Sequence, residues 1–419
     1  MSSKTIKIAM FIILVLVYMV SFVQAVVMTV IANDVMRDMN LTPAGMGRLG
    51  SFYMYGYSGA MLFSGMITVW LGPRRTLSTL CFVSGVGGIL FATSSSFAVA
   101  ALGRMLCGIG LSSNMTSAFT LFTRWYPSKI YARLCALFIA LGGLGTLLGI
   151  ALTPALNERW GWRTLFMGIA VMTLAYSVLV ALFIRNWPPE EARETTDAGS
   201  APRETLTPKI LWRSFLVIAK RLDFWRVVVW FACTAGIFFS FNGLWAMPYL
   251  KEIYSMSHDK AGAITSVVAF GYIVGAPTVS WIANKALRSY RVCLGTAALL
   301  TGIAFAVIIF RIDAMSTATI FFLVLLTGMT INGPTAIAHA SAHNLFGARM
   351  AGIASGVFGC AAFLGGALLQ TVCGELLHLA QSWGWEPASC YAFTFSPFLF
   401  CALVAAWAGY TLSKSSFPG

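Results

Sequence analysis

Residues 6–32 read IKIAMFIILVLVYMVSFVQAVVMTVIA, a run whose single charged residue is Lys7. A helix needs about 20 apolar residues to cross the hydrocarbon core of a bilayer, which is about 30 Å thick. This run is therefore long enough to span a membrane. The rest of the chain repeats the pattern, so the run indicates the fold class of the whole protein.

The start of the chain also resembles a secretory signal peptide. Lys4 and Lys7 precede the apolar run, and residues 23–25 (Val-Gln-Ala) resemble a cleavage site. The apolar core of a signal peptide is about 7–15 residues long, however, and this run is much longer. We therefore interpret residues 6–32 as a retained first membrane helix.

The composition excludes a soluble domain. Of 419 residues, 58% are hydrophobic and 10% are charged, against about 25% charged in soluble domains. The net charge of +14 could indicate nucleic-acid binding, but the basic residues fall in short gaps between apolar runs, so we expect no nucleic-acid partner. The Cys residues show no CxxC spacing, and we expect neither a metal nor a cofactor.

Eleven further apolar runs follow the first, which predicts an all-α protein with twelve membrane helices. Their bounds are uncertain by a few residues. The expected runs are 49–70, 76–94, 97–121, 134–156, 163–184, 225–249, 261–283, 292–310, 317–338, 350–373 and 390–411.

One long polar segment divides the chain. Residues 185–223 contain acidic, Ser, Pro and Thr residues, which is typical of a linker. We therefore expect six-helix bundles over residues 1–184 and 224–419. Residues 210–226 interleave apolar and basic residues at helical spacing, which favours an amphipathic helix on the membrane surface.

The basic residues predict the orientation. With the N-terminus inside, 20 of the 28 Lys and Arg residues are cytoplasmic, seven are external, and Arg104 lies within a helix. Cytoplasmic loops carry an excess of Lys and Arg, so we expect both termini in the cytoplasm.

The two halves repeat. A Trp-Gly-Trp sequence precedes the sixth run at 160–162 and the twelfth run at 383–385, and Arg133 and Arg349 open the fifth and eleventh runs. Internal repeats of this kind are typical of secondary transporters, in which the substrate site lies between the repeats.

The gap between the second and third runs carries a recognisable signature. Residues 65–75 read GMITVWLGPRR and resemble the first-loop motif of the major facilitator superfamily, which has glycines at Gly65 and Gly72 and basic residues at Arg74 and Arg75. The position of the acidic residue is occupied by Val69. In this family the loop forms a latch between helices.

The equivalent loop of the second half also departs from the pattern. Asn284 replaces the carboxylate and is followed by Lys285 and Arg288. Without both acids, we expect a weaker latch in which basic side chains contact carbonyl groups at helix C-termini.

The fourth run adds to the resemblance, which covers nearly the whole chain. Residues 103–110, GRMLCGIG, are similar to the Arg and spaced glycines of the family's fourth helix, and residues 124–133 are similar to the loop after it. The resemblance implies two pseudo-symmetric bundles, a monomer in the bilayer, and transport of a small solute by alternating access. It implies a transporter and not an enzyme, and leaves proton coupling open.

Arg104 is the strongest candidate for substrate binding. It lies seven residues into its run, about 10 Å along the helix, and an ionisable residue there is costly and often functional; the alternative is a side chain that reaches back to the surface. All fourteen Asp and Glu residues fall outside the middle of the runs, although Asp34 could reach the cavity. A guanidinium without an acid favours an anionic substrate.

Other polar and aromatic residues near the middle of the runs are candidates for lining the cavity, with interhelical packing as the alternative. They are Gln24, Tyr53, Tyr57, Asn114, Asn242, Trp245 and Asn332.

Two alternative functions stay open. The protein could export amphipathic compounds, or it could be a sensor that transports nothing.

Cys373 and Cys390 flank one expected external loop and could form a disulfide. His339 and His343 are four residues apart, but no Glu accompanies them, which favours a gate or surface role over a metal site.

Overall fold

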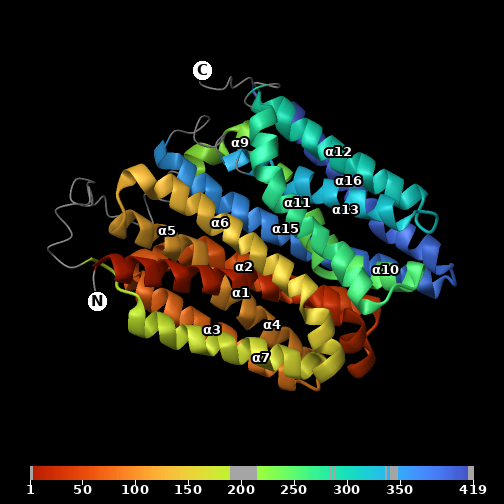
Figure 1. Ribbon diagram of the computed structural model, residues 1–419. Coiled ribbons are helices and arrows are strands. Elements are labelled where there is room, and N and C mark those ends of the chain that lie inside the picture. Colours follow the sequence, from red (N-terminus) through yellow and green to blue (C-terminus); the bar gives the residue numbers. More distant parts are fainter. Residues whose placement is uncertain are drawn as a thin grey trace.

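The computed structural model describes residues 3–188, 215–283, 285, 289–335, 337–339 and 348–413. The elements of the first half are α1 (Ser3–Asp38), α2 (Pro43–Leu71), α3 (Pro73–Thr93), α4 (Phe97–Leu111), α5 (Asn114–Trp125), α6 (Ser128–Ala151) and α7 (Thr153–Phe183) (Figure 1). Those of the second half are α9 (Leu222–Ser240), the π-helical turn η3 (Phe241–Trp245), α10 (Ala246–Tyr254), α11 (His258–Ile282), α12 (Tyr290–Phe310), α13 (Thr317–Asn332), α15 (Ala348–Ser382) and α16 (Pro387–Tyr410). The all-α class is confirmed.

Capping residues set the beginnings of several helices. The Thr42 hydroxyl accepts a hydrogen bond from the Gly45 amide before α2, and Ser96 caps α4 in the same way through the amide of Val99. Such side chains satisfy backbone amides that have no partner within the helix. Gly72, with a φ of 80°, separates α2 from α3, because its backbone adopts a conformation that other residues rarely take.

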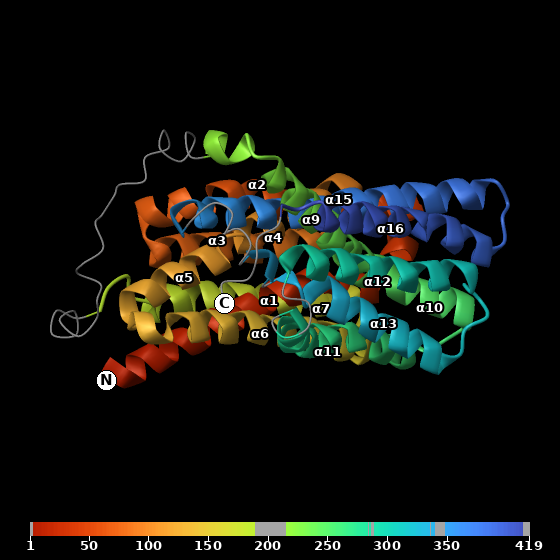
Figure 2. The ribbon, with the colours of Figure 1, turned by 90° about the horizontal axis from the view of Figure 1, so that it is seen from above.

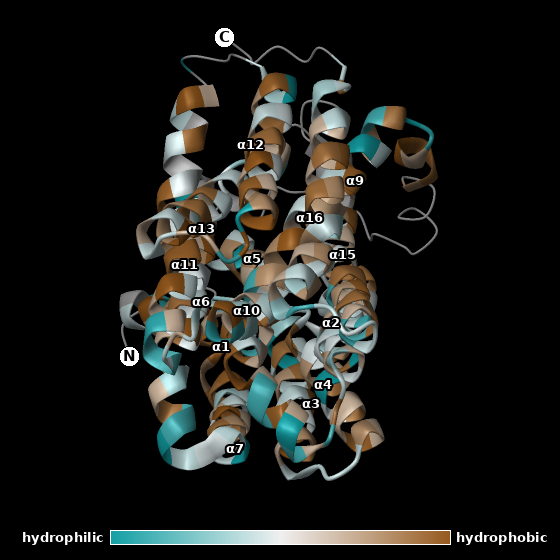
Figure 3. Cartoon of the chain, turned by 90° about the vertical axis from the view of Figure 1, so that its right-hand side faces the viewer, coloured by the Kyte–Doolittle hydropathy of each residue, from teal (hydrophilic) through white to brown (hydrophobic). Residues whose placement is uncertain are grey.

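Each of the twelve expected runs overlaps helical residues. In the described part of the chain, nine helices are long and apolar enough to cross a membrane, and hydrophobic residues cover much of their length (Figure 3). The number of crossings and the cytoplasmic termini stay predictions. A multi-pass membrane protein follows from the helices themselves.

Several expected bounds were wrong. The run 97–121 is broken after Leu111 into α4 and α5, and the run 225–249 contains the π-helical turn η3. The run 350–373 is part of a longer helix that ends at Ser382. Cys373 therefore lies inside α15 and not beside a loop, and both Cys373 and Cys390 are free thiols.

The expected linker lies mostly outside the described residues. Residues 189–214 are not described, and this range includes the start of the expected amphipathic helix 210–226. Residues 215–219 are helical and precede α9. The division into bundles at 1–184 and 224–419 stays a prediction.

The repeated Trp-Gly-Trp sequences share a backbone conformation. Gly161 has a φ of 76° and Gly384 a φ of 73°, although the two lie more than 200 residues apart in the sequence. Both glycines precede the final helical segment of their half. This agreement supports the internal repeat that the sequence indicates.

The helices of the first half lie together, and those of the second half lie beside them (Figures 1 and 2). At one end the Tyr126 hydroxyl donates to the Lys7 carbonyl, and the Arg74 amide donates to Asn186. We call this the Arg74 end, and the opposite end, where α1 finishes, the Asp38 end.

α2 and α15 join the two halves in an antiparallel pair. Tyr57 stacks on Phe363 at 3.9 Å between ring centroids. Near the Asp38 end, a Cβ added to Gly47 would lie 2.5 Å from the Gln370 carbonyl oxygen, so the backbones are in direct contact. Glu375, expected in a loop, lies in α15 and pairs with α2.

A second pair of helices, α6 and α11, also crosses the boundary. A Cβ on Gly262 of α11 would lie 2.9 Å from the Pro154 ring at the start of α7 and 3.3 Å from the Ile150 carbonyl oxygen. A Cβ on Gly143 would lie 3.0 Å from the ring of Tyr272. Small residues therefore bring the halves together at both seams.

Candidate functional site

Glycines position Arg104 in the first half. A Cβ on Gly103 would lie 2.7 Å from the Gly87 carbonyl oxygen of α3, and a Cβ on Gly108 would overlap the Tyr53 carbonyl group of α2. α4 therefore packs against both helices at backbone distance. This close packing places the Arg104 side chain inside the first half.

The Arg104 guanidinium is enclosed by aromatic rings. Its centre lies 4.9 Å from the ring centroid of Tyr53 and 5.8 Å from those of Phe91 and Phe166. Nη1 donates to the Gln24 carbonyl oxygen at 3.2 Å, while Nε has no hydrogen-bond partner. The residue is 1% exposed, so it does not reach back to the surface in this conformation.

Arg104 forms no ion pair in the described part of the chain, where four such pairs occur between other residues. The attraction of the ring faces compensates part of the charge. The guanidinium nonetheless stands as a buried cation without an anion.

Three other expected site residues meet Arg104 around α1. The Tyr53 hydroxyl donates to the Ser21 carbonyl oxygen at 2.9 Å, and Asn114 donates to the Val17 carbonyl oxygen and to the Ser21 hydroxyl. Gln24 donates to the Thr173 hydroxyl of α7 at 3.3 Å.

Two amide oxygens in this group have no hydrogen-bond partner, those of Gln24 and Asn114. Arg104 and Asn114 were expected on one continuous helix, but the break at Ser112 and Ser113 separates them. They reach α1 from helices α4 and α5, on either side of that break.

In the second half, the expected residues Asn242 and Trp245 lie in η3. Both are fully buried, and neither the Asn242 amide atoms nor the Trp245 indole nitrogen has a hydrogen-bond partner. The neighbouring Phe241 ring packs against Phe305 and Phe395, which holds this turn in the second half. π-helical turns are frequent at functional sites.

Sequence reasoning missed Gln370. Its side-chain nitrogen donates to the Phe239 carbonyl oxygen at 2.9 Å, its oxygen has no hydrogen-bond partner, and it is 1% exposed. A polar residue three positions before the end of the run 350–373 was visible in the sequence. It was passed over because it stood close to the expected end of the helix, which in fact continues to Ser382.

The expected gating residues of the first half lie at the Arg74 end. The Arg74 guanidinium donates to the Ala181 carbonyl oxygen in the last turn of α7, with 2.8 Å from Nε. Arg75 and Arg133 are exposed. A Cβ on Gly72 would lie 2.7 Å from the Asn186 side chain, and one on Gly65 would meet no atom within 4 Å. Their role in gating stays a prediction.

Other expected residues are described in part or not at all. Lys285 is exposed, with its ammonium 5.7 Å from the ring centroid of Trp281. Asn332 is the last residue of α13, and Arg349 lies in the first turn of α15, but their side chains are not described. Asn284, Arg288 and His343 lie outside the described residues.

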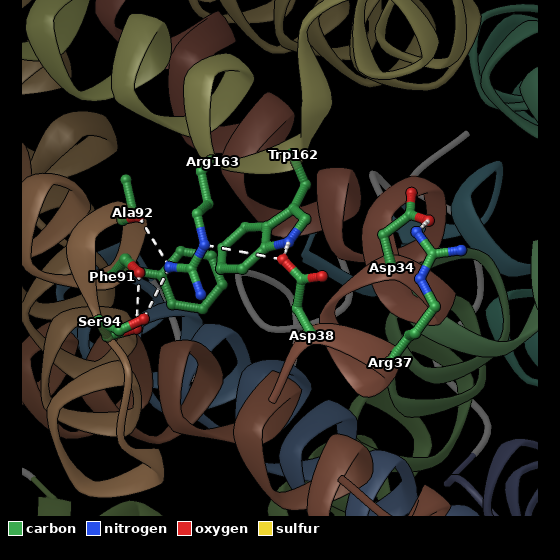
Figure 4. Close-up of polar contacts among 8 residues, drawn as sticks. All are labelled: Asp34, Arg37, Asp38, Phe91, Ala92, Ser94, Trp162 and Arg163. Carbon is green, nitrogen blue, oxygen red and sulfur yellow. Dashed lines mark hydrogen bonds and ion pairs between the residues drawn. The ribbon is translucent and has the colours of Figure 1, made fainter. Parts of the chain in front are cut away.

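A polar network joins helices at the Asp38 end (Figure 4). The Asp38 carboxylate accepts a hydrogen bond from the Trp162 indole nitrogen at 2.8 Å. Arg163 donates to the carbonyl oxygens of Ala92 and Ser94 at 3.1 and 2.7 Å. Asp34 pairs with Arg37 and accepts from Asn157, so in this conformation it belongs to the Asp38 end and not to the surroundings of Arg104.

These features define an all-helical, multi-pass membrane protein with buried polar groups between its helices. The model of the Major Facilitator Superfamily matches residues 10–246, more than half of the chain. The chain therefore belongs to this superfamily, and it is a membrane transporter and not an enzyme.

Curated relatives are distant. The chain is 23% identical over 281 residues to the probable sulfoacetate transporter SauU of Cupriavidus necator, covering 62% of this chain and 61% of the relative. It is 22% identical over 336 residues to the gentisate transporter of Corynebacterium glutamicum, covering 76% of this chain and 70% of that one. The match thus spans less than two thirds of the first relative.

Solved structures agree in fold. A bacterial homolog of the human lysosomal transporter Spinster, in an inward-facing and unoccupied conformation, superposes with a TM-score of 0.73 at 17% identity, covering 98% of this chain and 97% of the other. The D-xylose-proton symporter gives a TM-score of 0.74 at 15% identity, covering 97% of both chains. These likenesses establish the fold.

Proposed function

We propose that this chain carries a small organic anion across a bacterial inner membrane by alternating access, with Arg104 as the cation that attracts it. In this proposal the bundles 1–184 and 224–419, joined by the linker 185–223, rock against each other around the site.

One observation carries the proposal, and it is the unpaired charge of Arg104. A cation in the middle of a membrane helix costs about 2.5–3.5 kcal/mol on insertion scales. A guanidinium offers five N–H donors, and the described contacts of Arg104 are one carbonyl oxygen and three rings. A carboxylate or sulfonate would accept two parallel hydrogen bonds from such a group.

The named relatives support the same substrate class. Sulfoacetate carries a sulfonate and a carboxylate, and gentisate carries a carboxylate on an aromatic ring. Both of these substrates are organic anions, although their carbon skeletons differ. A binding site that recognises the negative charge first, and the skeleton second, accounts for that pattern.

Transport in proteoliposomes tests the proposal. The wild-type protein is assayed for uptake of radiolabelled sulfoacetate, gentisate and tartrate, and of xylose as an uncharged comparison. Arg104→Gln keeps an N–H donor for the Gln24 carbonyl group but removes the charge, and Arg104→Lys keeps the charge. We expect anion uptake to fall at least tenfold in Arg104→Gln and to persist in part in Arg104→Lys.

The matched control is Arg311→Gln, which removes an exposed cation outside the expected binding and gating residues. Thermal unfolding of each variant in detergent separates a lost charge from a lost fold. Wild-type anion uptake by a folded Arg104→Gln protein would overturn the role of Arg104. Uptake of xylose without uptake of any anion by the wild-type protein would overturn the substrate class.

A further inference from the structure

Among the buried side chains of the second half that carry unpartnered polar atoms in the described structure, three bear an amide or indole group and lie in or next to η3. Asn242 has neither amide atom hydrogen-bonded, Trp245 has a free indole N–H, and Gln370 has a free side-chain oxygen. All three are at most 1% exposed. Leaving such a group buried and unpaired is unfavourable, so this group of residues is destabilising in the absence of a ligand.

These residues lie where the two halves meet. A Cβ on Gly243, the residue after Asn242, would lie 3.4 Å from the Gln370 side-chain nitrogen and 3.4 Å from the Ala25 carbonyl oxygen of α1. A Cβ on Gly50 of α2 would lie 3.0 Å from the Gln370 side-chain oxygen. Gln370 therefore lies next to η3 and to α2, at the boundary that alternating access must open and close.

The backbone at this place is specialised. η3 interrupts the α-helical hydrogen bonding between α9 and α10. Met247, two residues after the turn, donates its amide to the Thr29 hydroxyl of α1 at 3.4 Å. π-helical turns are frequent at functional sites. The backbone of η3 is therefore a second indication of a ligand site, beside the unpaired side chains.

The unpaired atoms include donors and acceptors in one region. Asn242 and Trp245 offer N–H groups, while Asn242 and Gln370 offer amide oxygens. An ionised carboxylate can only accept hydrogen bonds, so it cannot satisfy the amide oxygens. A hydroxyl group both donates and accepts, and it satisfies both kinds of partner.

We infer that Asn242, Trp245 and Gln370 bind hydroxyl groups, and that the transported anion is hydroxylated. The inference rests on the anion transport proposed above and adds a division of labour. Arg104 attracts the charged group, and the second half recognises hydroxyl groups on the rest of the molecule. A site built to hydrogen-bond a hydroxyl group discriminates strongly against an analogue without it, because its own polar atoms are then left unpaired.

Paired substrates test the inference. Tartrate is compared with succinate, and gentisate with benzoate, because each pair differs in hydroxyl groups and retains the carboxylates. In proteoliposomes containing the wild-type protein, we expect kcat/KM for the hydroxylated member to exceed that of its partner at least tenfold in one pair or both. Asn242→Leu and Gln370→Met, which are close in size to the native residues, should reduce that ratio toward one, because uptake of the hydroxylated member falls more than uptake of the plain member.

Gln381→Met is the matched control, since Gln381 is an exposed glutamine on the same helix α15, and we expect it to retain the wild-type ratio. Thermal shifts of the wild-type protein with each substrate provide a measurement that needs no variant to fold, and only the hydroxylated members should stabilise it strongly. Equal uptake and equal shifts within both pairs would overturn the inference while leaving anion transport intact. A wild-type protein that moves none of the anions would overturn the proposed function itself.

Discussion

The guanidinium of Arg48 on α2 and the carboxylate of Glu375 on α15 form an ion pair across the boundary between the halves, with 2.7 Å between Nε and Oε1. Both side chains are about half exposed, and the pair lies near the Asp38 end. It bridges α2 and α15 at that end, so we expect it to break when these two helices separate there.

Breaking this pair should favour opening at the Asp38 end. An exposed pair contributes about 0.2–1 kcal/mol, so we expect Arg48→Gln or Glu375→Gln to raise the open population by about 1.4- to 5-fold. The measurement uses a protein whose native Cys residues are replaced and which carries Ser51→Cys at a buried position. The measured quantity is the rate at which a maleimide modifies that cysteine. Arg37→Gln, which removes a pair within α1, is the control.

Exchanging the two charges, Arg48→Glu with Glu375→Arg, should restore slow modification. An exchanged protein that reacts as fast as the single variants would show that the pair does not hold this end closed.

A disulfide at the same seam should arrest transport. The hydroxyl oxygens of Ser51 and Thr371 lie 3.1 Å apart, so cysteines at these two positions would bring their sulfur atoms close together. With native Cys residues replaced, we expect Ser51→Cys with Thr371→Cys to lose uptake on oxidation and to regain it on reduction. Each single substitution under the same oxidant is the control. Full uptake with the disulfide formed, as judged by gel mobility, would show that this seam need not open.

Much of the fold could be predicted because a bilayer imposes a minimum length on apolar helices. The run 6–32 lies inside α1, and the Trp-Gly-Trp turns at 160–162 and 383–385 fall where the sequence indicates, because glycine is the residue that accepts a positive φ. The family followed from the motifs at residues 65–75 and 103–110, and the division into two halves stays a prediction. The break between α4 and α5 was not predictable, since Ser112 and Ser113 resemble other polar residues within apolar runs.

The candidate site was only partly predictable, because tertiary packing decides which polar residues meet. Single-helix geometry cannot show that Tyr53 of α2 and Arg104 of α4 meet at Gln24 and its neighbours on α1. The π-helical turn around Asn242 depends on packing of Phe241 among distant rings, which leaves no local signal. Gln370 was missed for a related reason, since the end of its helix was misplaced by nine residues.

Glycine packing around Arg104 should be intolerant of a methyl group. A Cβ on Gly108 would overlap the backbone of Tyr53, whereas one on Gly168 of α7 would meet no atom within 4 Å. We expect Gly108→Ala to lower the melting temperature in detergent by several degrees, because overpacking costs about 1–3 kcal/mol. Gly168→Ala should leave it unchanged or raise it, since alanine favours helix by up to about 1 kcal/mol. Equal melting temperatures would contradict the close approach of α4 and α2.

Acidic pH should weaken closure at the Asp38 end through His258. This residue begins α11, is 8% exposed, and has its Nδ1 2.9 Å from the Lys251 ammonium of α10. Burial, and then the Lys251 charge, lower the pKa of His258, against a smaller opposing effect of Glu158 on α7 and Asp34 on α1. Its own helix adds the opposite charges of Asp259 and Lys260.

His258 binds a proton less readily when this end is closed than when it is open. The closed conformation therefore has its full stability above the ordinary histidine pKa of about 6.5, and it loses stability progressively below that pH. The measured quantity is the rate at which a maleimide modifies a cysteine introduced at Ser51, divided at each pH by the rate in a protein that also carries His258→Gln. This division corrects for the titration of the thiol itself. We expect the ratio to rise as the pH falls from about 6.5 to 5. Lys251→Gln removes a cation that lowers the pKa of His258 in the closed conformation, so it should make the acceleration at acidic pH smaller. A ratio to His258→Gln that stays constant with pH would exclude His258 as the titrating group.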